Sequence, residues 1–560
     1  MATGMGTDMV TGPSMTNKRL WAALLALGCS HARADVLGPN QNYAASAQGT
    51  PSGAATSPGP TSASAAPASG TQPSGRSLVI TPKVSLSETY TDNLTLSSIN
   101  PISDFITQVT PGINIRENSR RTKLKLNYDL LALYYNKESA LDHYYSQLDA
   151  SGNVELIDNL FYLNAAASNI QQPFALNGAY GLNLSNPSGN IVNLRNTNVS
   201  PYLTHRFGSF ATGLAEFSHV TQSYSMGGPS TSGYGYLGPL SSSTSDTSTL
   251  TLNSGTSFYT IPWGINLSDS NIHYTGVPDT RIANYSANIG YLFTRKFKIT
   301  LTGGYDDNNY VYFGQKPQQA FWSIGAGYAP TTRTQLSVST GRRYFGSTKS
   351  FMLKSTNKFA TLQASYDQNI TSSIMQDYIS PATTLDQLLQ TQIPNDTARQ
   401  QAVQAILSSM GSQLASLYGQ NVIANQIYLD KTFKTTLGVT LLKNTFIFTM
   451  FDSKMSSLQP GNSFLPGVLG YGAANQIGGT ATWNWKLTPK LSWNANANLV
   501  SSTFPGQTFS QRFGEVYMGF SRQLGLYVNG SIMYRYQTMT YGTLFNYNEN
   551  ALIAGLNFTY

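Results

Sequence analysis

Few residues of this chain have types and spacings that could support catalysis or metal binding. After residue 34 the sequence holds four histidines, and no two of them stand at a metal-ligand spacing such as H-x-x-x-H. They are His143, His205, His219 and His273. Residues 306–309 (Asp-Asp-Asn-Asn) offer oxygen ligands that suit calcium, but a polar strand end accounts for them more simply. We therefore predict no catalytic residues, no metal site and no cofactor.

A second set of candidate functional residues consists of charged side chains in segments that alternate apolar and polar residues. Lys123, Lys125 and Asp129 share one parity, and leucines and Tyr128 occupy the other. The further members of this set are Lys298, Glu515 and Arg535. In a closed membrane sheet they would face the lumen, where a net basic lining would favour anions. The alternative is that they pair with other charges and only stabilise the wall, and the sequence favours neither interpretation.

The composition excludes several classes of protein. Aromatic residues make up 12% of the 560 residues and charged residues only 11%, against about 25% charged residues in a typical soluble protein. The formal charge of +8 is spread along the chain, without a basic patch interleaved with aromatics, so we predict no nucleic-acid partner. Beyond the N-terminal region no run of about 18 apolar residues could span a membrane as a helix. Strands with one apolar face remain, and these suit a membrane barrel.

Alternating segments separated by turns fill the chain from residue 77 onward. Residues 491–499 (LSWNANANL) alternate strictly between apolar and polar side chains. Arg342 and Arg343 are adjacent, so only one of them can face a lumen. Eight connections are tight, at 118–121, 157–159, 207–209, 294–296, 330–333, 442–444, 488–490 and 523–525. Longer segments alternate with them, at 171–190, 225–245, 371–421 and 457–471.

Short turns on one side and long loops on the other are typical of outer-membrane barrels. The pattern therefore predicts an all-β fold over residues 77–560. We expect a transmembrane antiparallel up-and-down β-barrel of about 22 strands, within a range of 20 to 24, with both ends in the periplasm. Loop 371–421 differs from the others, because apolar residues recur at helical spacing after Asp396. We expect a helix at 396–418 in this loop, either folded into the mouth or packed on neighbouring loops.

The last eleven residues, 550–560, read as the final strand. Leu552, Leu556, Phe558 and Tyr560 share one parity, and the chain ends on an aromatic ring, which suits a membrane boundary. Gly555, Phe558 and Tyr560 resemble the C-terminal insertion signal of outer-membrane barrels. We expect this strand to pair with the first one, near residues 78–90, because lipid tolerates no open sheet edge.

The N-terminal 76 residues do not belong to this pattern. Residues 1–34 have a basic region, the apolar run LWAALLALG and an A-x-A site, which predicts a signal peptide cleaved after Ala34. Lipidation of Cys29 is the alternative, and Met15 is an alternative start. Residues 35–76 are rich in Ala, Ser, Pro and Gly and read as a disordered periplasmic leader.

Four short motifs recur in order along the chain: PKVSLSETYTDN at 82–93, PDTR at 278–281, GYDDNNY at 304–310 and GRRYFG at 341–346. Together they resemble an outer-membrane β-barrel family that accompanies the PEP-CTERM/exosortase and exopolysaccharide systems of Gram-negative bacteria. The resemblance covers about residues 78–560 and implies a location in the outer membrane. It also implies contact with lipid and lipopolysaccharide, insertion by the barrel-assembly machinery, and exopolysaccharide export components as partners.

Three functions are compatible with the predicted outer-membrane barrel. The first is a channel or export conduit, for exopolysaccharide or another surface polymer. The second is a structural or scaffold barrel, with its lumen plugged by loop 371–421, that serves a surface assembly system. The third, an outer-membrane enzyme, is disfavoured because the sequence shows no catalytic constellation.

Overall fold

The computed structural model describes ten stretches of the chain. They are residues 78–173, 184–187, 190–226, 242–275, 277–310, 316–375, 427–458, 474–504, 510–542 and 545–560. The chain divides into two units, Met1–Asn42 and Tyr43–Tyr560, and every described residue belongs to the second. The expected signal peptide (1–34), leader (35–76) and helix (396–418) lie outside the described residues.

The described residues form 22 strands and three short 3-10 helices. The first eleven strands are β1 (Leu78–Thr91), β2 (Asp104–Asn118), β3 (Thr122–Tyr135), β4 (His143–Ile157), β5 (Phe161–Pro173), β6 (Ile191–Phe207), β7 (Ala211–Met226), β8 (Ser243–Ser254), β9 (Trp263–Tyr274), β10 (Val277–Thr294) and β11 (Phe297–Asn308). The others are β12 (Gln318–Thr331), β13 (Thr334–Arg343), β14 (Gly346–Thr356), β15 (Ala360–Thr371), β16 (Tyr428–Leu441), β17 (Asn444–Ser457), β18 (Ala474–Thr488), β19 (Leu491–Thr503), β20 (Ser510–Gln523), β21 (Val528–Tyr541) and β22 (Phe545–Thr559). The 3-10 helices are η1 (Ser139–Leu141), η2 (Thr256–Phe258) and η3 (Ser373–Met375).

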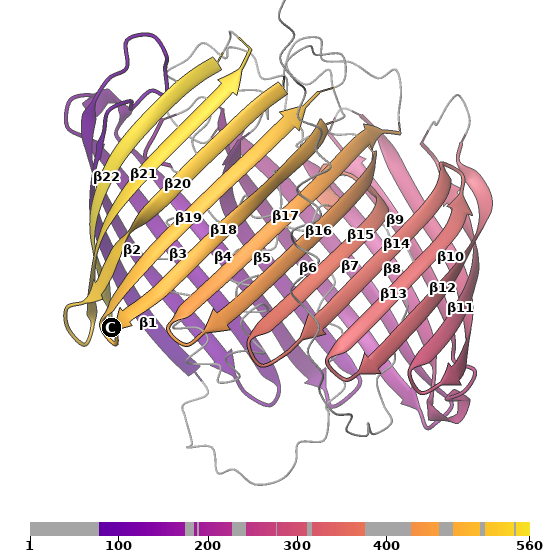
Figure 1. Cartoon of the computed structure of the whole chain (residues 1–560). Coiled ribbons are helices and arrows are strands. Elements are labelled where there is room, and N and C mark those ends of the chain that lie inside the picture. Colours follow the sequence, from indigo (N-terminus) through magenta and orange to yellow (C-terminus); the bar gives the residue numbers. More distant parts are fainter. Residues whose placement is uncertain are drawn as a thin grey trace, which may run out of the picture. The chain divides into compact units, whose positions relative to one another are not determined.

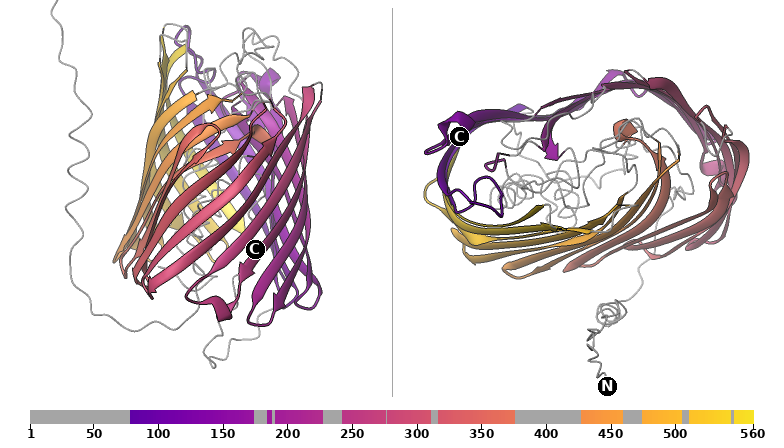
Figure 2. Two further views of the ribbon diagram at one scale, coloured as in Figure 1. Left: turned by 90° about the vertical axis from the view of Figure 1, so that its right-hand side faces the viewer. Right: turned by 90° about the horizontal axis from the view of Figure 1, so that it is seen from above.

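The strands form one closed antiparallel sheet (Figures 1 and 2). Each strand pairs with the next in sequence, and β1 pairs with β22 in a register that runs from Lys83–Thr559 to Thr91–Ala551. The expected barrel of about 22 strands is thereby confirmed, as is the pairing of the last strand with the first. Closure matters because no open backbone edge can be left in lipid.

The two faces of the wall differ as the alternation of the sequence requires. On β22 the outward side chains of Leu552, Leu556 and Phe558 are 54, 37 and 42% exposed, while the inward Glu549 and Ala551 are buried. An apolar outer face with a polar inner face is what a barrel in lipid needs. No helix among the described residues is long and apolar enough to cross a membrane.

The two ends of the barrel differ in the lengths of their connections. All eight short turns expected from the sequence lie at the end where β1 begins and β22 ends, and the longer segments lie at the other end. We call these the turn end and the loop end. At the turn end, residues 255–262 form an eight-residue connection that contains η2, and residues 524–527 form a four-residue connection. Short turns are periplasmic in outer-membrane barrels.

Candidate functional site: the lumen and its mouth

The inner face of the wall is lined largely by small polar side chains that bond to one another within and across strands. Ser200 Oγ donates to Asn198 Oδ1 at 2.8 Å, and Ser218 Oγ donates to the same oxygen at 2.9 Å. On β19 the inward residues Asn494, Asn496 and Asn498 continue this polar surface. Polar side chains that satisfy one another leave a wettable inner wall, which a solute pathway requires.

Asp129, one of the six charged residues singled out in the sequence, lies in an ion pair within the inner wall. Lys83 Nζ on β1 lies 2.8 Å from Asp129 Oδ2 on β3, and also donates to Asn127 Oδ1 at 2.9 Å. The pair spans the intervening strand β2 over Gly112. A Cβ atom on Gly112 would lie 2.1 Å from Asp129 Oδ1 and 2.8 Å from Lys83 Cε. The lack of a side chain at Gly112 is therefore what allows the two charges to meet.

Arg535 lies in a second, fully enclosed cluster near the loop end. Its Nη2 atom is 2.6 Å from Glu549 Oε1 and its Nε atom is 3.2 Å from Glu549 Oε2, and both side chains are at most 2% exposed. Thr91 Oγ1 donates to Glu549 Oε1 at 2.7 Å, which ties β1 to β22. Glu515 is also buried and interacts electrostatically with Arg535. Arg535 and Glu549 therefore stabilise the seam at which the barrel closes.

Lys123, Lys125 and Lys298 lie in the inner wall close to the turn end. Lys123 and Lys125 are exposed, and no hydrogen bond or ion pair joins them to another described residue. Four further basic residues also face inward near this end of the barrel. Together the set comprises Arg116, Lys123, Lys125, Arg206, Lys298, Lys354 and Lys486. We call these seven residues the basic vestibule. Glu155 is the inward acidic residue nearest the turn end among the strand residues that the structure describes.

Other charges were not anticipated as inner-wall residues from the sequence. Asp306 faces the lumen and binds the guanidinium group of Arg343, whose Nε donates to Asp306 Oδ2 at 2.9 Å. Asp307 points outward and pairs with Arg281 at 2.9 Å. The two carboxylates of the 306–309 run therefore diverge, one into the lumen and the other to the outer face. Arg342, the neighbour of Arg343, faces outward.

The four histidines do not converge on one site. His219 Nδ1 lies 2.7 Å from Asp246 and His273 Nδ1 lies 2.6 Å from Asp279, both on the outer face. His205 packs edge-on against Phe207 near the turn end, and His143 lies near the loop end. In the described part of the chain, no group of three His, Cys, Asp or Glu side chains could hold a metal ion.

At the loop end, connecting segments fold inward across the mouth. Asn186, from the β5–β6 connection, accepts a bond from Arg535 Nη2 at 3.1 Å and donates to the carbonyl oxygen of Leu94 at 3.2 Å. Leu184 packs in an apolar cluster with Leu94, Ile106 and residues of β3 and β4. This segment therefore crosses from the β5–β6 side to the closing seam.

The 3-10 helix η3 follows directly after β15 and also lies inside the ring of strands, as the view from above in Figure 2 shows. Its residues Ser373, Ile374 and Met375 are at most 3% exposed. Gln222 on β7 donates to the Ser373 carbonyl at 3.4 Å, and Ile374 packs with Ile272 of β9. The connection from β15 to β16 therefore begins by reaching the opposite wall.

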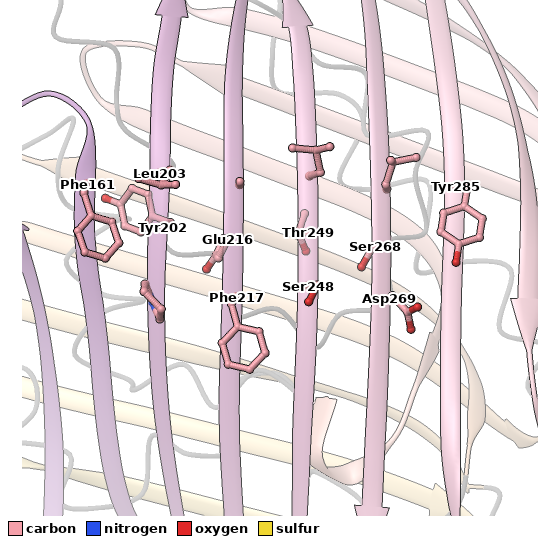
Figure 3. Close-up of a pocket in the computed structure, with 14 residues that line it drawn as sticks. Phe161, Tyr202, Leu203, Glu216, Phe217, Ser248, Thr249, Ser268, Asp269 and Tyr285 are labelled. Atoms are coloured by element: carbon pink, nitrogen blue, oxygen red, sulfur yellow. The ribbon is translucent and has the colours of Figure 1, made fainter.

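A pocket over β5 to β10 has a volume of about 510 Å³ (Figure 3). Its lining is mostly outward and apolar, including Phe161, Leu203, Phe217 and Leu250. Because these side chains face the membrane, the groove suits lipid acyl chains rather than a water-borne solute.

Comparisons with known proteins found similar solved structures but no related sequence. No family model matches the chain, and no curated protein matches it. The siderophore receptor PirA from Pseudomonas aeruginosa is similar at 7% identity, over 86% of this chain and 80% of that chain, with a TM-score of 0.40. The outer membrane protein opdK from Pseudomonas aeruginosa is similar at 10% identity, over 86% and 99%, with a TM-score of 0.32. The ferric-catecholate import receptor Fiu from E. coli K12 is similar at 11% identity, over 85% and 81%, with a TM-score of 0.40.

The closed sheet, the apolar outer face and the short turns at one end make this chain an outer-membrane β-barrel.

Proposed function

We propose that the barrel is an outer-membrane channel for anionic solutes. The observation that carries the proposal is the basic vestibule, in which seven cationic side chains face the lumen near the turn end. Positively charged side chains that line a narrow, low-dielectric passage raise the local concentration of anions and slow the entry of cations. Nearer the loop end, by contrast, Arg343 and Arg535 are neutralised by Asp306 and Glu549. The excess of basic over acidic side chains in the described inner wall is therefore concentrated near the turn end.

The resemblance to the exopolysaccharide-associated barrel family supports a more specific proposal. An acidic surface polymer that leaves the periplasm would meet the basic vestibule first, and would then pass the inward-folded segments at the mouth. Such a conduit would work with exopolysaccharide export components in the periplasm, and would be inserted by the barrel-assembly machinery. The protein would be surrounded by phospholipid and lipopolysaccharide.

Charge reversal tests the channel directly. We expect the variant Lys123→Glu/Lys125→Glu to move the reversal potential under a KCl gradient in a planar bilayer toward cation preference. The matched control is Lys137→Glu/Lys454→Glu, which changes two lysines outside the inner wall and should leave the reversal potential unchanged. Unchanged selectivity in the vestibule variant, with conductance retained, would contradict the proposal.

A scaffold barrel with a plugged lumen is the second candidate, because η3 and residues 184–187 fold into the mouth. Replacing residues 376–426 by a short Gly-Ser linker distinguishes the two functions and leaves η3 in place. A channel should conduct before the deletion and conduct more after it. A scaffold should conduct only after the deletion.

A further inference from the structure

The tips of the turns at the periplasmic end carry a strong excess of positive charge. The ten connections at this end hold eight basic residues and one acidic residue, a net charge of 8 − 1 = +7. The basic residues are Arg120, Arg121, Arg295, Lys296, Arg333, Lys358, Lys443 and Lys490, and the acidic one is Asp158. All eight are exposed. The described connecting residues of the loop end hold two basic and three acidic residues, a net charge of 2 − 3 = −1.

These cations are arranged around the wall, at the edge of its apolar band. Five consecutive turn-end connections, from β10–β11 to β18–β19, each carry at least one of them. The six cations of these connections therefore form an arc along the turn-end rim of the wall. They differ from the basic vestibule, whose residues lie on strands and face the lumen.

Exposed apolar side chains stand directly beside these cations. The Lys358 ammonium lies 5.4 Å from the centre of the Phe359 ring, and Phe359 is 52% exposed. Leu442 precedes Lys443 and is fully exposed. Phe293, just before Arg295, is 57% exposed. An apolar side chain and a cation at one tip match the boundary between acyl chains and headgroups, where lysine and arginine extend toward phosphate groups.

We propose that this arc binds the phosphate headgroups of anionic phospholipids in the inner leaflet of the outer membrane. Neighbouring tips act on the same lipid surface, and the attraction operates within about 8 Å at physiological salt. A soluble acidic partner would not account for the exposed leucine and phenylalanine side chains between the charges. The lipid also fits the position of the arc, because the apolar band of the wall ends at these turns.

Lipid retention by the barrel purified from outer membranes tests the proposal. The barrel is placed in nanodiscs of phosphatidylethanolamine with 20 mol% phosphatidylglycerol, and native mass spectrometry counts the lipids that it retains. The variant Arg295→Gln/Lys296→Gln/Lys443→Gln/Lys490→Gln removes four of the six cations of the arc. The control Lys137→Gln/Lys316→Gln removes charge at the loop end.

We expect the native barrel to retain phosphatidylglycerol severalfold above its bulk fraction. The turn-tip variant should lose at least half of this enrichment, and the control should keep it. A heat-dependent shift in SDS gel mobility shows that each variant is folded. A second variant, Lys443→Arg/Lys490→Arg, conserves charge and should retain the enrichment.

Two results would overturn the inference: no enrichment in the native barrel, or equal enrichment in a folded turn-tip variant. Release of the retained lipid by soluble polyglutamate at equal charge concentration would instead assign the arc to an acidic partner. The test is independent of the channel proposal, because the turn-tip variant keeps all seven vestibule residues. If the turn-tip variant lost lipid binding but kept its ion selectivity, the loss would be due to the arc and not to the basic vestibule.

Discussion

The variant Glu549→Gln should weaken the barrel at its closing seam. Glu549 accepts two bonds from Arg535, one from Thr91 and one from Asn186, and the pair of charges is almost entirely removed from solvent. The change keeps the shape of the side chain but leaves the Arg535 guanidinium group without its main counter-charge. Removing one partner of a buried ion pair typically costs about 3–5 kcal/mol.

The cost should fall at the lower end of that range, about 3 kcal/mol, because two other groups still interact with the guanidinium. Asn186 Oδ1 accepts one of its bonds at 3.1 Å, and the Glu515 carboxylate attracts it. Urea unfolding in phospholipid vesicles, followed by tryptophan fluorescence, measures the effect. With an m-value of about 3 kcal/mol/M, the midpoint should drop by about 1 M.

The double variant Arg535→Met/Glu549→Leu separates the ion pair from the packing. Exchanging a whole buried pair for apolar side chains is often neutral or stabilising, so we expect the double variant to be more stable than Glu549→Gln. The reasoning would be refuted if Glu549→Gln unfolded at the native midpoint. It would also be refuted if the double variant were the less stable of the two.

Two further predictions concern other parts of the wall. Gly112→Ala should lower stability by about 1–3 kcal/mol, because its Cβ would displace the ion pair that spans β2 and would lie 2.8 Å from the Tyr128 carbonyl oxygen. Gly303→Ala, where no atom lies within 4 Å of the added Cβ, should unfold in urea as the native barrel does. The variant Phe558→Ser/Tyr560→Ser removes two exposed aromatic side chains at the end of the last strand and should reduce the amount of heat-modifiable barrel in outer-membrane fractions. Normal amounts would mean that these rings do not contribute to insertion.

The fold was predictable because the period of two repeats over so many strands. Strict alternation in 491–499 and in β3 assigns each residue to one face of the sheet, even when the neighbouring strands are not known. The two-residue turns, such as 442–443, then fix which end of the barrel each strand reaches. Local pattern and global closure agree, which leaves little freedom in the count of strands.

The partners of the charged residues could not be predicted in the same way. Asp129 was recognisable as an inward charge, but its partner Lys83 lies two strands away and depends on the absence of a side chain at Gly112. Thr91 and Glu549 are 458 positions apart and meet only because the barrel closes. Register between distant strands decides such contacts, and alternation alone does not give it.

A similar limit applies to the mouth. The helical spacing after Asp396 pointed to a special role for the β15–β16 connection, but that stretch lies outside the described residues. What the structure does describe is the start of the connection, where Ile374 is buried against β9. No local sequence pattern at residues 373–375 indicates that they cross the lumen.

The seam between β14 and β15 differs from every other seam of the wall. Its register covers six residue pairs, from Thr356–Thr361 to Phe351–Tyr366, whereas β15 and β16 remain paired as far as Thr371–Tyr428. Toward the loop end the wall therefore divides into two hairpins, β13–β14 and β15–β16. No backbone pairing joins β14 to β15 there. Backbone amides beyond Tyr366 on that edge should exchange with solvent deuterium sooner than their counterparts in other seams. If the barrel ever admits a strand from another chain, this is the place at which a backbone partner is already missing.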